Sequence, residues 1–100
     1  MKPEIKQMIT SLENRLLEEI YSALENNYEH EDDIELQFNV GEVTYEALRV
    51  YRDDDGKVDS VEVDESWLGS DGQIYSESAE LASLGLSVLI AVLDSLEKSI

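Results

Sequence analysis

Apolar residues recur at steps of three and four from residue 3 to about residue 27, the spacing of one face of an α-helix. Pro3 suits the first turn of this helix, because the N–H that proline lacks would have no partner there. Asn26 and Asn27 suit its end, since asparagine tolerates the left-handed conformation that often follows a helix. The pattern predicts a long amphipathic N-terminal helix. Its apolar stripe consists of Ile5, Met8, Ile9, Leu12, Leu16, Ile20, Ala23 and Leu24.

A charged connection over residues 29–33 follows, and the apolar period then changes to two, which indicates β-strands. We expect a loop of three residues, 39–41, between the first two strands. A loop of that length places Leu36 and Phe38 on the face that also carries Leu48, whereas a two-residue loop would place them on the opposite face. The predicted strands cover residues 34–39, about 42–52 and about 58–67.

The run from Asp53 to Gly56 is the strongest hairpin signal in the chain. A two-residue turn at Asp55 and Gly56 brings apolar residues together on one face of the hairpin and opposite charges together on the other. The expected cross-strand pairs are Leu48 with Val63 and Val50 with Val61 on the apolar face, and Arg49 with Glu62 and Tyr51 with Ser60 on the polar face.

The last third of the chain predicts a second helix from about Glu77 to Ser99, preceded by a short fourth strand at residues 73–75. Trp67 is expected to close one end of the core. The second helix carries two apolar stripes, so one can cover the sheet while the other needs the first helix or a second copy of the chain. The candidate oligomer interface consists of Ala82, Leu86, Leu89, Leu93 and Leu96, and the same spacing continues to Ile100.

Together these elements predict one α+β domain over residues 1–100 with the order αβββα. Its sheet is a three-stranded antiparallel meander, with a possible short fourth strand, and the N- and C-terminal helices cover one face.

Charge then restricts the partners. The 100 residues include 24 Asp and Glu against 7 Lys and Arg, a formal net charge of -17. An acidic surface repels nucleic acid and anionic lipid, so we expect no direct nucleic-acid binding and no membrane association. The chain has no cysteine, which excludes disulfides and is compatible with a reducing compartment. The first residues lack the apolar run of a signal peptide, and we expect a cytoplasmic protein.

The acidic residues concentrate in the predicted sheet and its loops. Residues 29–65 contain 14 acidic and 3 basic residues, a net charge of -11. If both helices cover one face, these charges gather on the other face and at its rims, where tyrosine side chains could anchor a partner. The candidate partner-binding residues are Glu35, Tyr45, Arg49, Tyr51, Asp53, Asp54, Asp55, Asp59, Glu62 and Asp64.

Two features of the sequence are candidates for metal binding or catalysis. Residues 51–62 partly match an EF-hand calcium loop, but Tyr51 stands at the first ligand position and the flanks are typical of strands. An acidic hairpin is the interpretation we favour, and weak cation binding between Asp53 and Asp59 stays an alternative. His30 is the single histidine, and no nucleophile motif accompanies it. We therefore expect no catalytic residues, no metal centre and no cofactor.

Two functions remain. The first is a small acidic, non-enzymatic binding protein that docks on a basic or nucleic-acid-binding protein. Its strongest form imitates DNA, as inhibitors carried by phages and mobile elements do; the likeness is one of charge, size and layout, because no motif carries it. The second is a homodimeric structural protein whose charge serves solubility.

Overall fold

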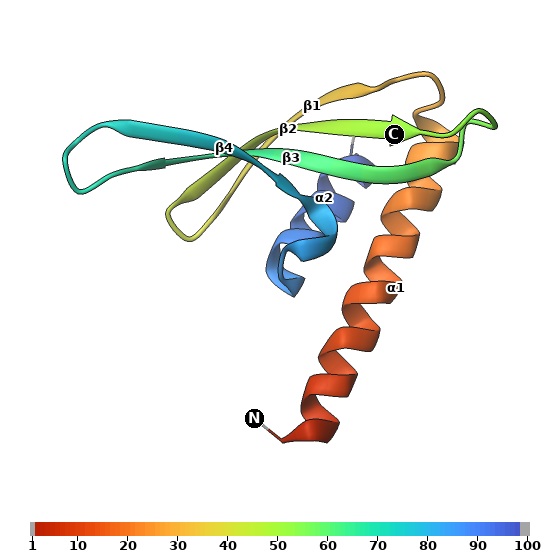
Figure 1. The fold of residues 1–100 in the computed structure, drawn as a ribbon, viewed down its shortest axis with the longest axis horizontal. Helices are drawn as coiled ribbons and strands as arrows, with labels where there is room; N and C mark the ends of the chain where they lie inside the picture. Colours follow the sequence, from red (N-terminus) through yellow and green to blue (C-terminus); the bar gives the residue numbers. More distant parts are fainter. Residues whose placement is uncertain (1, 99–100) are drawn as a thin grey trace.

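A four-stranded antiparallel sheet with the strand order β1-β2-β3-β4 carries both long helices on one of its faces (Figure 1). The computed structural model describes residues 2–98, and the expected helix end at Ser99 and the stripe position Ile100 lie outside them. The α+β class and the covering of one face are confirmed. The elements are α1 (Pro3–Asn27), β1 (Asp33–Val40), β2 (Val43–Arg52), β3 (Val58–Leu68), β4 (Ile74–Glu80), a 3₁₀ turn η1 (Leu81–Ser83) and α2 (Leu86–Lys98).

The core lies between the sheet and the helices. The C-terminal half of α1, the inward positions of β1 to β3, η1 and one face of α2 all contribute buried side chains. The Tyr28 hydroxyl just after α1 donates a hydrogen bond of 2.9 Å to the Leu96 carbonyl, which fixes one helix against the other. The buried apolar residues are Ile20, Leu24, Ile34, Tyr45, Leu48, Val50, Val61, Val63, Leu81, Val88, Leu89, Val92 and Leu96.

The register of β2 and β3 is as predicted, but the turn between these strands is not. All four expected pairs are present, from Leu48 with Val63 to Tyr51 with Ser60. The loop has three residues, 54–56, because Asp53 donates its N–H to the Lys57 carbonyl at 2.9 Å. The ladder then pairs Arg52 with Val58, and a bulge before the next pair absorbs the extra residue.

The turn between β1 and β2 is one residue shorter than the predicted three-residue loop. The turn there has two residues, Gly41 and Glu42, and Gly41 has a φ of 63°, which the first central residue of a type II′ turn requires. A bulge at residues 36–37 compensates for the shorter turn, so Leu36 and Phe38 still lie on the inward face of the sheet and pack against the core.

A second bulge, at Glu46, changes the placement of Tyr45. Simple alternation puts Tyr45 on the face of Arg49, but the extra residue turns it inward, where it is 5% exposed and stacks on Phe38 with ring centroids 5.1 Å apart. Tyr45 is therefore a core residue, and its expected place in the partner-binding surface is wrong.

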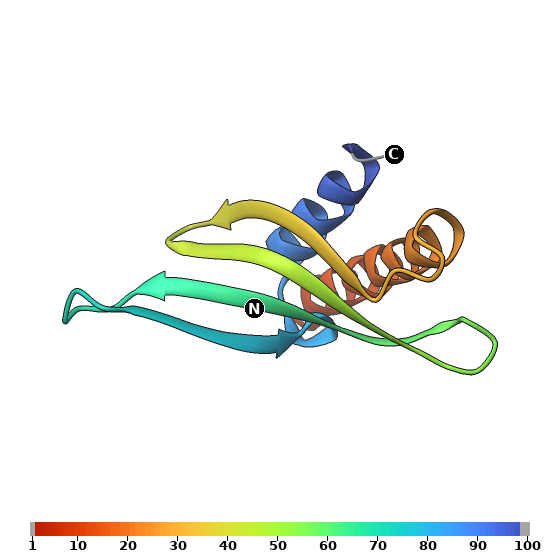
Figure 2. The same cartoon turned by 90° about the horizontal axis from the view of Figure 1, so that it is seen from above.

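β4 replaces the first turns of the predicted second helix. It pairs with β3 over its whole length, from Glu80 opposite Glu62 to Ile74 opposite Leu68, and α2 begins only at Leu86. The β3–β4 hairpin extends beyond the helices (Figure 2). Trp67 belongs to this hairpin and stacks on Tyr75, with ring centroids 6.3 Å apart. It is not among the residues that form the core or pack against it, so its expected role at the end of the core is wrong.

Candidate functional site

The face of the sheet away from the helices collects carboxylates in two cross-strand rows. Antiparallel pairing aligns side chains across neighbouring strands on one face, so the register places these rows directly. We call the charged residues of the two rows the acidic face: Asp33, Glu35, Glu62, Asp64 and Glu80, with Arg49 among them. The first row is Asp33, Arg49, Glu62 and Glu80, and the second is Glu35, Ala47, Asp64 and Ser78.

Arg49 is the positive centre of the acidic face. Its guanidinium nitrogens lie 3.9 Å from Asp33, 3.4 Å from Glu62 and 3.4 Å from Asp64. A hydrogen bond with the Tyr51 side chain, and next the charge of Asp64, raise the pKa of Arg49. Three carboxylates contact this one cation, so Arg49 neutralises only part of their charge and the acidic face stays net negative.

Like charges also face each other across β3 and β4. Glu62 stands opposite Glu80 on the acidic face, and Glu65 stands opposite Glu77 on the other face. Burial, and then the charge of Glu77, raise the pKa of Glu65. Directly opposed like charges destabilise a strand pair. This pairing is therefore weakened at neutral pH, and a cationic group between the strands would relieve it.

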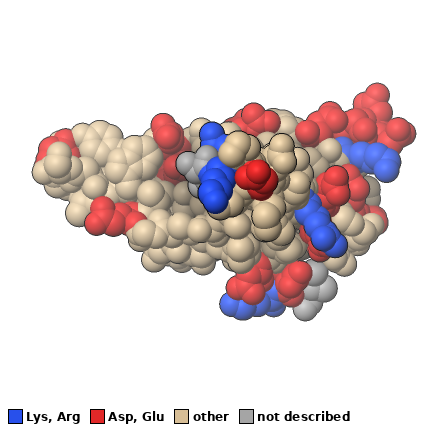
Figure 3. Space-filling view, turned by 90° about the horizontal axis from the view of Figure 1, so that it is seen from below, with Lys and Arg blue, Asp and Glu red and all other residues tan. Residues whose placement is uncertain are grey.

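The opposite side of the molecule differs in charge distribution. Seen from the helix side, acidic and basic groups are interspersed: both kinds lie near the middle of the view, and more acidic groups lie toward its edges (Figure 3). The acidic face is distinguished by the regular spacing of its carboxylates in two rows of one sheet. It holds five of the 24 acidic residues of the chain, four of them from residues 29–65.

The aspartates of the β2–β3 hairpin do not join the acidic face. Asp54 lies five residues beyond Arg49 in the sequence, about 16 Å at the rise of an extended strand. Asp53 supports the turn, because its Oδ1 accepts the N–H groups of Asp55 and Lys57 at 2.9 and 3.0 Å. Among residues 2–98, no group of three or more His, Asp or Glu side chains is arranged to hold a metal ion.

Of the other candidate residues, Tyr51 is exposed beside Arg49, while Asp54, Asp55 and Asp59 point to solvent from the hairpin. The candidate oligomer interface is not a single surface. Leu89 is 2% exposed and Leu96 is 1% exposed, so both belong to the core of the single chain, and their expected role in an interface is wrong. Leu93 packs partly against this core, Leu86 is half-buried, and Ala82 is exposed in η1.

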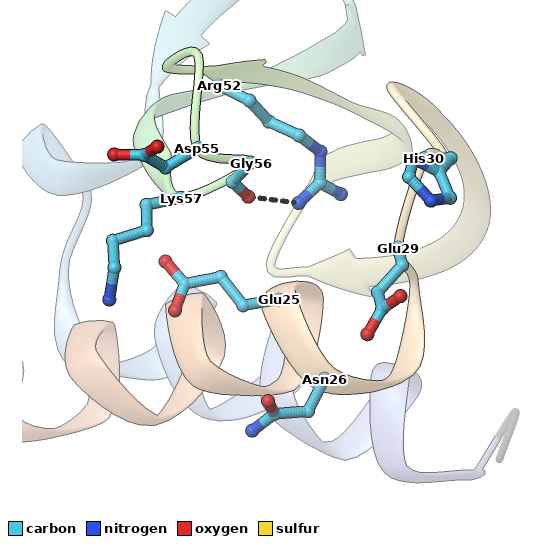
Figure 4. A pocket seen from close by; sticks show the side chains of 8 residues that line it. All are labelled: Glu25, Asn26, Glu29, His30, Arg52, Asp55, Gly56 and Lys57. Atoms are coloured by element: carbon cyan, nitrogen blue, oxygen red, sulfur yellow. Dashed lines mark hydrogen bonds between the residues drawn. The ribbon is translucent and has the colours of Figure 1, made fainter.

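Arg52, which the sequence patterns did not assign to a site, joins α1 to the hairpin. Its side chain is 11% exposed, and its Nη2 donates to the carbonyls of Tyr28 at 2.8 Å and Glu31 at 2.9 Å, with a longer contact of 3.4 Å to Leu24. Its Nη1 donates to the Gly56 carbonyl at 3.3 Å (Figure 4). The carbonyls of Leu24, Tyr28 and Glu31 lie at and after the end of α1, where orphan acceptors need a donor, and that of Gly56 lies in the hairpin.

A neighbouring hydrogen bond reinforces this junction, since Glu25 accepts the Val58 N–H at 2.9 Å. The Nε of Arg52 lies 3.4 Å from the Asp32 carboxylate without forming a hydrogen bond, so we treat this contact as an ion pair only. The alternation along β2 could have indicated this role. Arg52 follows Leu48 and Val50 at steps of two, which places it on the inward side of the strand, where a cation needs a polar partner.

A polar hollow of about 370 Å³ opens beside Arg52, between α1 and the hairpin (Figure 4). It contains the single histidine, His30, which is exposed and adopts a φ of 69° in the connection after α1. The lining supplies carboxylates, a lysine, an arginine and the histidine, and it has no serine, threonine or cysteine. The lining residues are Glu25, Asn26, Glu29, His30, Arg52, Asp55, Gly56 and Lys57.

No family model, no curated protein and no solved structure matches this chain. Over residues 2–98, neither helix combines the length and the apolar character needed to cross a membrane.

Proposed function

We propose that the protein is a small, non-enzymatic binding module that docks the acidic face on a basic surface of a protein partner. The observation that carries this proposal is the presence of five carboxylates, three of them within 3.9 Å of Arg49, on the face that the helices leave open. Electrostatic complementarity of this kind mainly increases the association rate and the specificity of an interface.

In its strongest form, the acidic face imitates the phosphates of nucleic acid and occupies the binding site of a DNA-binding protein. Strands lie about 4.8 Å apart and residues on one face of a strand about 6.6 Å apart, so the carboxylates of β1 form one closely spaced negative group and those of β3 and β4 form another. In this form of the proposal, these two groups take the place of backbone phosphates. An inhibitor from a phage or mobile element would have this use for such a surface. A cysteine-free composition suits the cytoplasm, where we propose that it acts.

The test compares two triple variants with the same net charge. The first, Glu35→Gln, Glu62→Gln and Asp64→Asn, removes three charges from the acidic face, and the second, Glu4→Gln, Glu13→Gln and Glu18→Gln, removes three from α1. Each is immobilised and used to capture proteins from a host lysate at about 50 mM and about 500 mM salt. We expect wild type and the α1 variant to retain a basic protein at low salt only, the acidic-face variant to lose it, and duplex DNA to compete it off.

An equal loss in both variants would show that bulk charge, and not the acidic face, is responsible. Retention of nothing by wild type at low salt would refute docking on a basic protein. A captured protein that duplex DNA fails to displace would refute the DNA-mimic form alone.

We also propose that the chain forms a homodimer. The supporting observation is exposed apolar surface on α1, where Met8 is 65% exposed and Ile5 and Leu12 are 46% and 48% exposed. Light scattering over a range of protein concentrations tests this, and a monomer throughout would refute it.

A further inference from the structure

Most of the N-terminal half of α1, residues 3–16, projects away from the sheet and from α2 (Figure 1), and Leu16 at its end packs partly against the core. At 1.5 Å per residue it is about 21 Å long. The fully buried positions of α1 are Ile20 and Leu24, both in its other half. The apolar residues of the projecting half that remain exposed are Ile5, Met8 and Leu12.

This half of α1 is poorly equipped to stand alone in water. Helical segments shorter than about 12–15 residues are marginal without tertiary support. Lys2 occupies the N-cap without a side-chain capping bond, and Lys2 and Lys6 place positive charge near the positive end of the helix dipole. Pro3 and Glu4 favour the first turn, but no side chain of this half is fully buried, and a packing partner would add tertiary support.

Charge indicates which partner fits. Residues 2–16 contain three basic residues, Lys2, Lys6 and Arg15, and two acidic residues, Glu4 and Glu13, so their net charge is +1. The other residues together carry -18, which gives the chain its net charge of -17. In Figure 3, basic groups cluster where the N-terminal end of α1 points toward the viewer. Electrostatic repulsion between two copies of this acidic chain is therefore weakest where these segments meet. A basic protein that binds the acidic face would gain no electrostatic attraction from residues 2–16.

We propose that two copies of the chain dimerise by packing the projecting halves of α1 against each other in antiparallel orientation. This inference rests on the proposed homodimer and is independent of docking by the acidic face. A two-fold axis between Met8 and Leu12 places Ile5 of one copy against Leu16 of the other, and Met8 against Leu12. The contact is isologous and closes at two chains.

The antiparallel arrangement also separates the two acidic bodies. It brings Lys2 of each copy level with Glu19 of the other. It holds the two acidic bodies at opposite ends of the helix pair, about 21 Å apart, which exceeds the Debye length of about 8 Å at physiological ionic strength. A parallel pair would set both bodies side by side and bring the lysines together.

Sedimentation equilibrium on the full chain tests the surface with two double variants of equal charge and spacing. Met8→Glu with Leu12→Glu alters the apolar stripe, and Gln7→Glu with Ser11→Glu alters exposed polar positions one residue earlier. We expect wild type and the polar-side variant to dimerise, and the stripe variant to dimerise at least about 100-fold more weakly, since each disrupted anchor contributes at least about tenfold. Circular dichroism and thermal unfolding check that the body stays folded.

Cross-linking tests the orientation, because the chain has no native cysteine. A mixture of Ile5→Cys and Leu16→Cys chains should form mixed disulfide dimers, whereas Ile5→Cys alone should not. Efficient self-cross-linking of Ile5→Cys would overturn the antiparallel arrangement. A dimer that survives Met8→Glu with Leu12→Glu would overturn this surface but not the homodimer, and a wild-type monomer at all concentrations would overturn both. Binding of monomers to vesicles of anionic phospholipid through the stripe would also overturn the proposal.

Discussion

Replacing Arg52 should separate α1 from the β2–β3 hairpin. Its guanidinium is the common donor to Tyr28, Glu31 and Gly56, and only a small part of the side chain reaches solvent. In Arg52→Met the aliphatic stem remains and the donors are lost. The carbonyls that end α1 would then depend on whatever water reaches them.

The magnitude follows from the contacts. The bonds to Tyr28 and Glu31, at 2.8 and 2.9 Å, are short and charge-assisted, and bonds to charged groups contribute about 1.5–3 kcal/mol each. The longer bonds to Gly56 and Leu24 and the ion pair with the exposed Asp32 add little. We expect a loss of about 3 kcal/mol in the free energy of unfolding, which lowers the melting temperature by about 15 °C for a domain of this size.

Urea unfolding, followed by circular dichroism and Trp67 fluorescence, measures this loss. Arg49→Met is the matched control, because it removes the same group from a more exposed site on the acidic face. Arg52→Lys should recover only part of the stability, since lysine lacks the planar fork. If Arg52→Met and Arg49→Met shift the urea midpoint equally, the role of Arg52 at the end of α1 is refuted.

Three further predictions concern the core, salt and pH. Leu48→Ala should cost about 2–5 kcal/mol in urea unfolding, because Leu48 is fully buried, while Leu68→Ala, at 67% exposed, should change stability by less than about 0.5 kcal/mol; equal effects would contradict the placement of the core. The melting temperature should rise between about 10 mM and about 500 mM sodium chloride, since screening relieves the repulsion of a chain of net charge -17, and a fall would contradict this. The raised native pKa of Glu65 means that its ionisation destabilises the fold: stability from this group is greatest below its ordinary pKa of 4.5 and falls as pH rises through the native value. Glu65→Gln should therefore be more stable than wild type at pH 7 with a smaller difference at pH 4, and the reverse order would refute the assignment.

The sequence predicted those parts of the fold that depend on strong periodicity. The boundaries of α1 were predictable because a proline and a pair of asparagines frame an apolar stripe. The register of β2 and β3 was predictable because only one alignment pairs valines with valines and Arg49 with Glu62. This alignment also placed Arg49, Glu62 and Tyr51 on the open face.

Other features were hidden for physical reasons. Alternation assumes that no strand has an extra residue, so the bulge at Glu46 reversed the side assigned to Tyr45. β4 lacks an apolar alternation because it is largely exposed on both faces, and Glu77, Ala79 and Glu80 suit a helix equally well. The stripe of α1 indicated an amphipathic helix but not how far the body would cover it. The role of Arg52 was hidden because it depends on where the C-terminal end of α1 lies relative to β2.

The charges on β4 have a consequence for the physical state of concentrated solutions. β4 is an edge strand, and its outer backbone groups have no neighbouring strand within the sheet. Such an edge is a template for runaway strand addition between molecules, which natural proteins suppress with charged side chains. On β4, the charges of Glu77 and Glu80 provide that protection. Replacing both glutamates with glutamine should therefore remove a barrier to fibril formation, and Ile74, which is 75% exposed on the same strand, would favour the first contact.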